Sequence, residues 1–175
     1  MKNMIKNLFI TGKPGCGKTT LIKELCLPVM ERAGGFFTEE MNGNGLRQGF
    51  LLKTLDGREG IFAKKGMKSA YKFNKYGINI GVLEGLGADS LIKAAKSKDL
   101  IVIDEIGSME IISEVFRKAL LECLNSEKKV LATVRYNAQP FTDEIKKMKN
   151  TSMLVLSREN YVDMKKQVRD WIERL

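Results

Sequence analysis

The chain contains no histidine among its 175 residues. Histidine is the usual acid–base group at neutral pH and the commonest metal ligand in proteins. Its absence excludes Ser-His-Asp hydrolysis, Cys-His chemistry and histidine-ligated metal sites. Proton transfer in any reaction must therefore rely on carboxylates, a bound metal ion or the substrate itself.

Cysteines are few, and their spacing fits neither a metal site nor a disulfide framework. We expect Cys26 and Cys123 to pack as small apolar side chains and Cys16 to be a spacer in a glycine-rich segment. No apolar run is long enough to span a bilayer, and residues 1–4 lack the apolar core of a signal peptide. These features predict a cytoplasmic protein that does not contact membranes.

Acidic residues are outnumbered, which leaves a formal net charge of +9. An excess of this size is compatible with nucleic-acid binding. However, the lysine pairs are scattered along the chain and form no single block. We therefore favour a solvated surface over a nucleic-acid partner, which stays an alternative. The pairs are Lys64-Lys65, Lys128-Lys129, Lys146-Lys147 and Lys165-Lys166.

The most informative segment is residues 12–19, which match the phosphate-loop pattern G-x-x-x-x-G-K-T. An apolar strand is expected before it, at residues 5–10, and a helix after it, from Thr20. Backbone N–H groups and the helix N-terminus would then surround an anion. Lys18 would reach the β- and γ-phosphates, and the Thr19 hydroxyl would ligate Mg²⁺. The predicted nucleotide-binding residues here are Gly12, Lys13, Pro14, Gly15, Cys16, Gly17, Lys18, Thr19 and Thr20.

A second candidate segment follows the wholly apolar run at 100–103. A carboxylate at the end of such a buried strand faces the ligand crevice of an open α/β sheet. Asp104 therefore fits a magnesium ligand acting through water. Glu105 is well placed to polarise the water that attacks the γ-phosphate. Glu105 and Lys18 are the two predicted catalytic residues. Ile106 and Gly107 complete the predicted nucleotide-binding set.

Thr133 ends another apolar strand, predicted at 130–134. If this strand lies between those of the phosphate loop and Asp104, its hydroxyl would contact the γ-phosphate or hold the attacking water. Threonine is also an ordinary strand residue. A cation that stabilises the transferring phosphoryl group would come from Arg47, Arg135 or Arg158, although most arginines in a basic chain lie on the surface.

The order of elements predicts an α/β fold with a mainly parallel sheet in a single domain, residues 1–175. Pro28 should kink or end the first helix, and Gly34-Gly35 should form a turn. A hairpin-rich insert is expected at about residues 36–82, with its turn at Asn42–Gly45. Further helices are expected at 90–98, from Ile112, from Pro140 and at the C-terminus, and a last strand at 153–156. The helix from Ile112 should bury Val115, Phe116, Ala119 and Cys123. The C-terminal helix should pack inward with Tyr161, Met164, Val168, Trp171, Ile172 and Leu175.

Four segments carry a more specific pattern: 35–40 reads G-F-F-T-E-E, 45–50 G-L-R-Q-G-F, 54–57 T-L-D-G, and 104–110 D-E-I-G-S-M-E. In this order they resemble the G-F-[Y/F]-T-E-E, G-x-R-x-G-F, T-L-x-G and D-E-I-G-K-M-E signatures of the THEP-type nucleoside-triphosphatases. That family includes the cancer-related nucleoside-triphosphatase of animals. Tyr76 and Glu84 match a further Y…E spacing, so the resemblance covers nearly the whole chain.

The resemblance implies a RecA-like, three-layer P-loop fold with an added β-hairpin region. It also implies slow, Mg²⁺-dependent hydrolysis of nucleoside triphosphates with broad base tolerance. The chain departs from the pattern at Ser108, where the family usually has lysine, at Asn160-Tyr161, where arginine is frequent, and at Pro28. Two alternatives stay open: a nucleotide or small-molecule kinase, whose insert and Arg47 would hold the acceptor, and a nucleic-acid-coupled ATPase. Oligomeric state and preferred base are not indicated.

Overall fold

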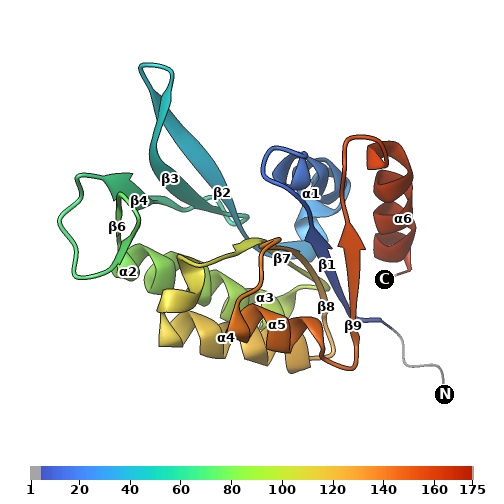
Figure 1. Ribbon diagram of the computed structural model, residues 1–175. Helices are drawn as coiled ribbons and strands as arrows, with labels where there is room; N and C mark the ends of the chain where they lie inside the picture. Colours follow the sequence, from blue (N-terminus) through green and yellow to red (C-terminus); the bar gives the residue numbers. More distant parts are fainter. Residues whose placement is uncertain (1–4, 175) are drawn as a thin grey trace.

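The computed structural model describes residues 5–174. All of its strands join one nine-stranded sheet, with the order β5-β6-β4-β3-β2-β7-β8-β1-β9 (Figure 1). The strands are β1 (Asn7–Thr11), β2 (Ala33–Gly43), β3 (Leu46–Thr54), β4 (Glu59–Lys65), β5 (Lys72–Phe73), β6 (Tyr76–Ile78), β7 (Leu100–Ile106), β8 (Lys129–Val134) and β9 (Thr151–Val155).

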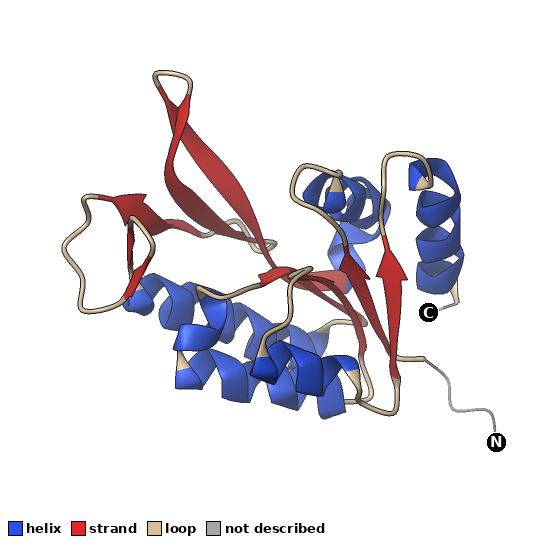
Figure 2. Cartoon of the chain, in the orientation of Figure 1, coloured by secondary structure: helices blue, strands red, loops and turns tan. Residues whose placement is uncertain are grey.

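Helices cover both faces of the sheet, which confirms the predicted three-layer α/β fold (Figure 2). One face carries the first and last helices, and the other carries the middle ones. Two separate hydrophobic clusters, one against each set of helices, form the core. The helices are α1 (Lys18–Cys26), η1 (Leu27–Arg32), α2 (Ile80–Val82), η2 (Leu83–Ala88), α3 (Asp89–Ser97), η3 (Glu110–Ile112), α4 (Glu114–Asn125), α5 (Pro140–Lys146) and α6 (Tyr161–Glu173).

The phosphate-loop strand β1 lies in the parallel part of the sheet. It pairs with β8 and β9, while β7 pairs with β8 and with the first part of β2. The predicted strands 100–103 and 130–134 lie within β7 and β8, and both are buried, as their apolar sequences require. Because β8 separates β1 from β7, the condition stated for Thr133 is met. The carboxyl ends of all three strands meet at one edge of the sheet.

The rest of the sheet is antiparallel and contains the predicted hairpin insert. Beyond its pairing with β7, strand β2 continues outward and returns as β3. Asn44 and Gly45 form the turn between them, with φ angles of 50° and 72°. This is the left-handed geometry that makes Asn-Gly a strong hairpin sequence. Phe36 and Phe37 belong to both ladders, because they pair with β7 on one side and with β3 on the other. The boundary of the insert at about residue 36 stays a prediction.

The prediction that Gly34-Gly35 forms a turn is wrong, because both residues lie in β2. Gly35 has a φ of 117°, and a Cβ atom there would lie 2.0 Å from the carbonyl oxygen of Val102. A Cβ atom on Gly34 would meet the Cβ of Ala94 at 2.8 Å. The two glycines therefore allow β2 to approach β7 and α3 closely, which is a second reason for glycine besides a turn.

Other predicted elements differ from the structure only in detail. Helix α1 ends before Pro28, and Pro140 begins α5, as predicted. Val115 is 47% exposed, because the buried stripe of α4 starts at Phe116 and Val115 points away from it. Leu175 and residues 1–4, on which further predictions were made, lie outside the described residues. Within residues 5–174, no helix has the length and apolarity that a membrane crossing needs, and the cytoplasmic location stays a prediction.

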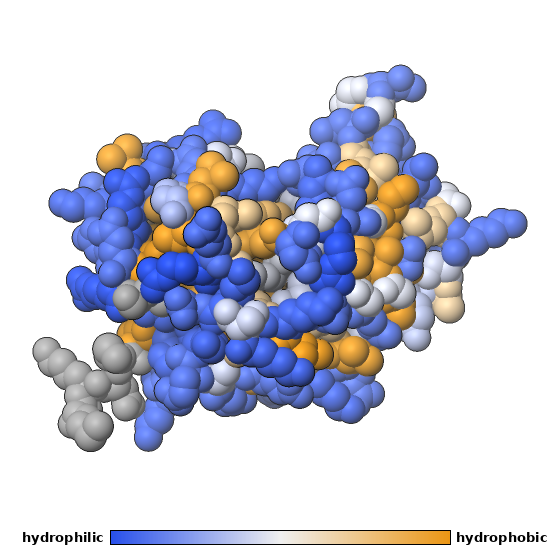
Figure 3. All heavy atoms as spheres, turned by 180° about the vertical axis from the view of Figure 1, so that it is seen from behind, coloured by the Kyte–Doolittle hydropathy of each residue, from blue (hydrophilic) through white to orange (hydrophobic). Residues whose placement is uncertain are grey.

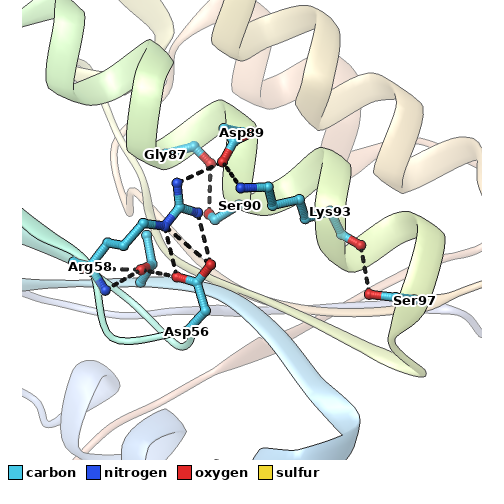
Figure 4. Close-up of polar contacts among 8 residues, drawn as sticks. Asp56, Arg58, Gly87, Asp89, Ser90, Lys93 and Ser97 are labelled. Carbon is cyan, nitrogen blue, oxygen red and sulfur yellow. Dashed lines mark hydrogen bonds and ion pairs between the residues drawn. The ribbon is translucent and has the colours of Figure 1, made fainter.

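Ion pairs attach the insert to the helical layer (Figure 4). Arg58, which follows the β3–β4 turn, bonds Asp56 on that turn and reaches Asp89 at the start of α3, with 2.7 Å between Nη1 and Oδ2. Lys93 contacts the same Asp89 carboxylate at 2.8 Å. These cations hold the pKa values of Asp56 and Asp89 below their usual range. The network therefore sets the position of the β3–β4 turn against α3.

We expect Gly35→Ala to destabilise the protein by about 3 kcal/mol or more, because the new Cβ meets backbone and the residue keeps a positive φ. Urea unfolding measures the change. The control is Gly85→Ala in η2, where no atom outside the local helix backbone lies within 4 Å of the new Cβ. It should be neutral or stabilising by up to about 1 kcal/mol. Equal unfolding midpoints for the two variants would contradict the close-packing explanation.

Candidate functional site

The phosphate loop connects the end of β1 to the start of α1. Gly15 and Gly17 have φ angles of 77° and 100°, which other residues rarely adopt. Helix α1 begins directly after Gly17, so its N-terminal N–H groups point into the loop. The Lys18 ammonium folds back over the loop and donates to the Gly12 carbonyl at 3.0 Å. The loop is therefore an anion cradle with a cation at its mouth.

Asp104 lies behind this cradle and is fully buried. Its Oδ1 accepts a hydrogen bond from the Thr133 hydroxyl at 2.5 Å, whereas its Oδ2 is buried without a partner among the described residues. Burial raises the pKa of the Asp104 carboxyl, against the opposing effects of Thr133, Thr19 and the charges of Lys23 and Lys18. An unpartnered, buried carboxylate oxygen is costly unless a ligand satisfies it.

These residues fit a magnesium ion. Magnesium takes oxygen ligands and is typically held by one or two carboxylates together with substrate phosphates and water. The Thr19 hydroxyl and the Oδ2 of Asp104 are oxygen donors at the phosphate loop. Within residues 5–174, no cluster of acidic or cysteine side chains could hold a metal by itself. The remaining ligands would therefore come from a bound phosphate and water.

Glu105 lies half-buried in the wall of the cavity that the phosphate loop opens into. Burial raises the pKa of its carboxyl. The charge of Lys18 opposes this shift, the charge of Asp104 adds to it, and Arg135 lowers the pKa again. A carboxylate with a raised pKa is a better proton acceptor than a solvated one. The position and environment of Glu105 therefore suit a general base.

The cavity has a volume of about 800 Å³ and runs from the phosphate loop to the β2–β3 hairpin. It is visible as a hollow between the hairpin and the main body in the view from behind (Figure 3). The predicted site residues that line it are Gly12, Pro14, Gly15, Gly17, Lys18, Thr19, Thr20, Arg47, Glu105 and Gly107. The predicted residues Lys13, Cys16, Asp104, Ile106 and Thr133 do not line it.

Two of the three arginines proposed to assist phosphoryl transfer line the cavity, Arg47 and Arg135. Arg135 follows β8, its backbone N–H donates to the Ile106 carbonyl, and its guanidinium donates to the Ser108 hydroxyl. Arg47 forms an ion pair with Glu40 on the hairpin. Arg158 is absent from the cavity wall. The geometry therefore favours Arg135, which lies beside Glu105.

One structural feature of the site was missed, the ion triad between α1 and the hairpin. Glu39 of β2 contacts Lys23 of α1 at 2.5 Å and Lys53 of β3 at 2.8 Å. Both lysines hold the pKa of Glu39 below its usual range. The triad joins the phosphate-loop helix to the insert. The T-E-E segment was noted in the sequence, but nothing in the sequence indicates that its partner lies on α1.

Glu110 is a second missed residue. It is 3% exposed, and its Oε2 accepts a hydrogen bond from the Gly107 backbone N–H at 3.0 Å. Burial raises its pKa to about 8, and the charge of Glu105 adds to the shift. Glu110 thereby braces the loop that follows Glu105. The sequence shows a glutamate shortly after the predicted site residues 104–107, but it does not show that this glutamate is buried.

Known proteins resemble this chain over most of its length. The family described as NTPase matches residues 7–171. A nucleoside-triphosphatase THEP1 of Thermotoga sp. (strain RQ2) is 46% identical over 153 residues, which cover 87% of each chain. A nucleoside-triphosphatase THEP1 of Aquifex aeolicus is 32% identical over 176 residues, 95% of this chain and 99% of its own.

Two solved structures share the fold. The crystal structure of THEP1 from the hyperthermophile Aquifex aeolicus has a TM-score of 0.83 at 33% identity and covers 93% of this chain and 96% of its own. The solution structure of a human cancer-related nucleoside triphosphatase has a TM-score of 0.80 at 27% identity and covers 97% and 98%. More than nine-tenths of the chain therefore has a counterpart in each of two solved structures.

We expect Glu110→Gln to change how stability depends on pH. Between the ordinary pKa of 4.5 and about 8, the folded protein holds a proton on Glu110 that the unfolded chain has lost. The wild type therefore loses stability as pH rises, by up to about 1.4 kcal/mol per pH unit. Gln keeps an acceptor for Gly107 and does not titrate. From pH 5 to pH 8, the variant should gain about 3 kcal/mol relative to wild type in urea unfolding.

The control for this experiment is Glu114→Gln, on the exposed surface of α4. Glu114 pairs with Lys118, which lowers the pKa of its carboxyl instead of raising it. Its substitution should produce no gain in relative stability as pH rises. If the difference in the free energy of unfolding between wild type and Glu110→Gln stays constant across pH 5–8, Glu110 is ionised at neutral pH in the folded protein.

Proposed function

The chain belongs to the NTPase family as a nucleoside-triphosphatase similar to THEP1, and we propose that it hydrolyses nucleoside 5′-triphosphates, ATP, GTP and others, in a Mg²⁺-dependent reaction. The observation that carries the proposal is the placement of Glu105 and Lys18 in the wall of one cavity, with the unpartnered Oδ2 of Asp104 behind Thr19. The products are the nucleoside diphosphate and inorganic phosphate.

Binding of the triphosphate rests on the phosphate loop. The backbone N–H groups of the loop and the N-terminus of α1 receive the phosphate oxygens. Lys18 leaves the Gly12 carbonyl, to which it now donates, and extends to the β- and γ-phosphates. A magnesium ion held through Thr19 and, through water, Asp104 would supply charge neutralisation of the β- and γ-phosphate oxygens.

Hydrolysis needs a water molecule aligned with the bond that breaks. Glu105 accepts a hydrogen bond from this water and takes its proton as the water oxygen attacks the γ-phosphorus. The Thr133 hydroxyl donates to Asp104 and thereby positions this carboxylate. Its contact with the γ-phosphate or with the attacking water stays a prediction. Arg135 places positive charge near the transferring group and, through Ser108, orders the loop after Glu105.

We expect Glu105→Gln to lower kcat by about 10²–10⁴ while KM changes little, because Gln can orient water but cannot accept its proton. Lys18→Ala should weaken triphosphate binding and turnover together, since it removes a charge that contacts the ground state and the transition state. Phosphate release gives kcat and KM, and calorimetry with a non-hydrolysable triphosphate gives affinity. Glu122→Gln, on the exposed face of α4, is the control. Normal turnover in Glu105→Gln would exclude it as the base.

The magnesium site has its own test in Asp104→Asn. The substitution keeps the shape of the side chain and the acceptor for Thr133, but removes the charge that would hold a water-bridged cation. The Mg²⁺ concentration needed for half-maximal triphosphate binding should rise by about 10–100-fold. Calorimetric titration of Mg²⁺ in the presence of a non-hydrolysable triphosphate measures it, and urea unfolding checks that the variant is folded. An unchanged Mg²⁺ requirement would remove Asp104 from the site.

A further inference from the structure

The antiparallel insert turns an aromatic surface toward the cavity. Phe50 of β3 and Tyr76 of β6 are in edge-to-face contact, with 5.4 Å between ring centroids, and Phe73 of β5 pairs with Tyr76 across the strands. Tyr76 is buried, whereas Phe50 and Phe73 are half-buried and line the cavity. Two aromatic side chains are therefore open to a ligand on the side of the cavity away from the phosphate loop.

Cations surround these rings. The Arg47 guanidinium lies 5.4 Å from the Phe50 centroid, and the Lys75 ammonium lies 5.7 Å from that of Tyr76. Lys65 pairs with Tyr76 in the β4–β6 register, so its side chain leaves the same face of the sheet. Glu40 neutralises Arg47, but Lys65 and Lys75 form no ion pair within residues 5–174. We call Arg47, Phe50, Lys65, Phe73, Lys75 and Tyr76 the insert face.

The surrounding sequence strengthens the charge of this region. Five lysines and no acidic residue occur between residues 60 and 83. The lysines do not all serve one surface. Lys64 and Lys72 both pair with Gly77, so they leave the face opposite to that of Tyr76. Lys65 thus shares a face with Tyr76 and the Lys75 ammonium lies near the Tyr76 ring, whereas Lys64 and Lys72 leave the other face.

The position of the insert face relative to the phosphate loop limits what it can bind. From β1, the sheet passes through β8 to β7, which carries Glu105, and only then through β2 to the insert (Figure 1). The insert face therefore lies beyond Glu105 as seen from the loop. A triphosphate whose γ-phosphate lies between Lys18 and Glu105 has its terminal phosphate toward the insert and its nucleoside at the other end.

We propose that the insert face is a second binding site, for a nucleotide unit distinct from the triphosphate: an aromatic base against Phe50 and Phe73, with its phosphate at Lys65 and Lys75. The proposal rests on the proposed function, because that function defines which end of the cavity holds the γ-phosphate. Bases stack on exposed aromatic side chains regardless of their identity, and nearby cations bind the attached phosphate. The unit is a mononucleotide or the end of a single strand, which share this chemistry.

Calorimetry tests the proposal on protein saturated with Mg²⁺ and a non-hydrolysable triphosphate. AMP is titrated in one arm and a 5′-phosphorylated single-stranded hexanucleotide in the other. We expect at least one of them to bind to the loaded protein. Phe73→Ala and the double variant Lys65→Ala/Lys75→Ala should each weaken that binding by about tenfold. Tighter binding of the hexanucleotide identifies a strand end, and binding of AMP alone identifies a small acceptor or effector.

The double variant Lys64→Ala/Lys72→Ala is the matched control, since it removes the same charge from the same part of the insert, on the face opposite to that of Tyr76. It should change the affinity by less than about twofold. Equal losses in the two lysine variants would overturn the proposal in favour of diffuse charge attraction. Binding of neither probe to the loaded protein would also overturn it. Binding only in the absence of the triphosphate would overturn it by showing that the insert face holds the base of the triphosphate itself.

The same wild-type preparation is assayed for phosphate release from ATP, which separates the two proposals. Phosphate release without binding of either probe would leave the proposed function intact and remove the second site. Binding of a second nucleotide without phosphate release would keep the second site and remove the proposed hydrolysis.

Discussion

The hydrogen bond between Thr133 and Asp104 is the contact on which the arrangement of the site depends. It joins β8 to β7 close to the carboxyl ends of both strands, with β1 and its phosphate loop on the far side of β8. In a parallel sheet, the order of the strands decides which loops meet. Here that order places Asp104 behind Thr19, and the hydroxyl of Thr133 orients one carboxylate oxygen so that the other stays free for a ligand.

Three carboxyl groups lie close together in this part of the molecule, Asp104, Glu105 and Glu110, and burial raises the pKa of each. Adding negative charge to such a group is costly unless cations compensate for it. Lys18 and Arg135 supply only part of this compensation for Glu105. A cation that arrives with the phosphates is therefore electrostatically favourable, and binding of the substrate and ionisation of the site are coupled through the same charges.

Much of the fold was predictable because it depends on local signals. The glycine pattern at 12–19, the apolar strands before Asp104 and Thr133, and the Asn44-Gly45 turn each determine their own backbone. The errors arose where the reason for a residue lies elsewhere in the chain. Gly34 and Gly35 are small because β7 and α3 approach them, and Glu110 is buried by the loop that it braces. The periodicity of apolar residues predicts the helix or strand to which a residue belongs. It does not predict which other element packs against that residue.

The insert completes the cavity because it is fixed at both ends. Arg58 binds its β3–β4 turn to α3, and Glu39 joins its first two strands to the phosphate-loop helix through Lys23 and Lys53. An extension of the sheet held in this way cannot swing away from the loop without breaking ion pairs at either attachment. Arg47, Phe50 and Phe73 are thus kept in the wall of the cavity that also contains Glu105. The cavity thus has an anion-binding loop on one wall and an aromatic, basic surface on the other. Hydrolysis of the triphosphate does not by itself require the second wall.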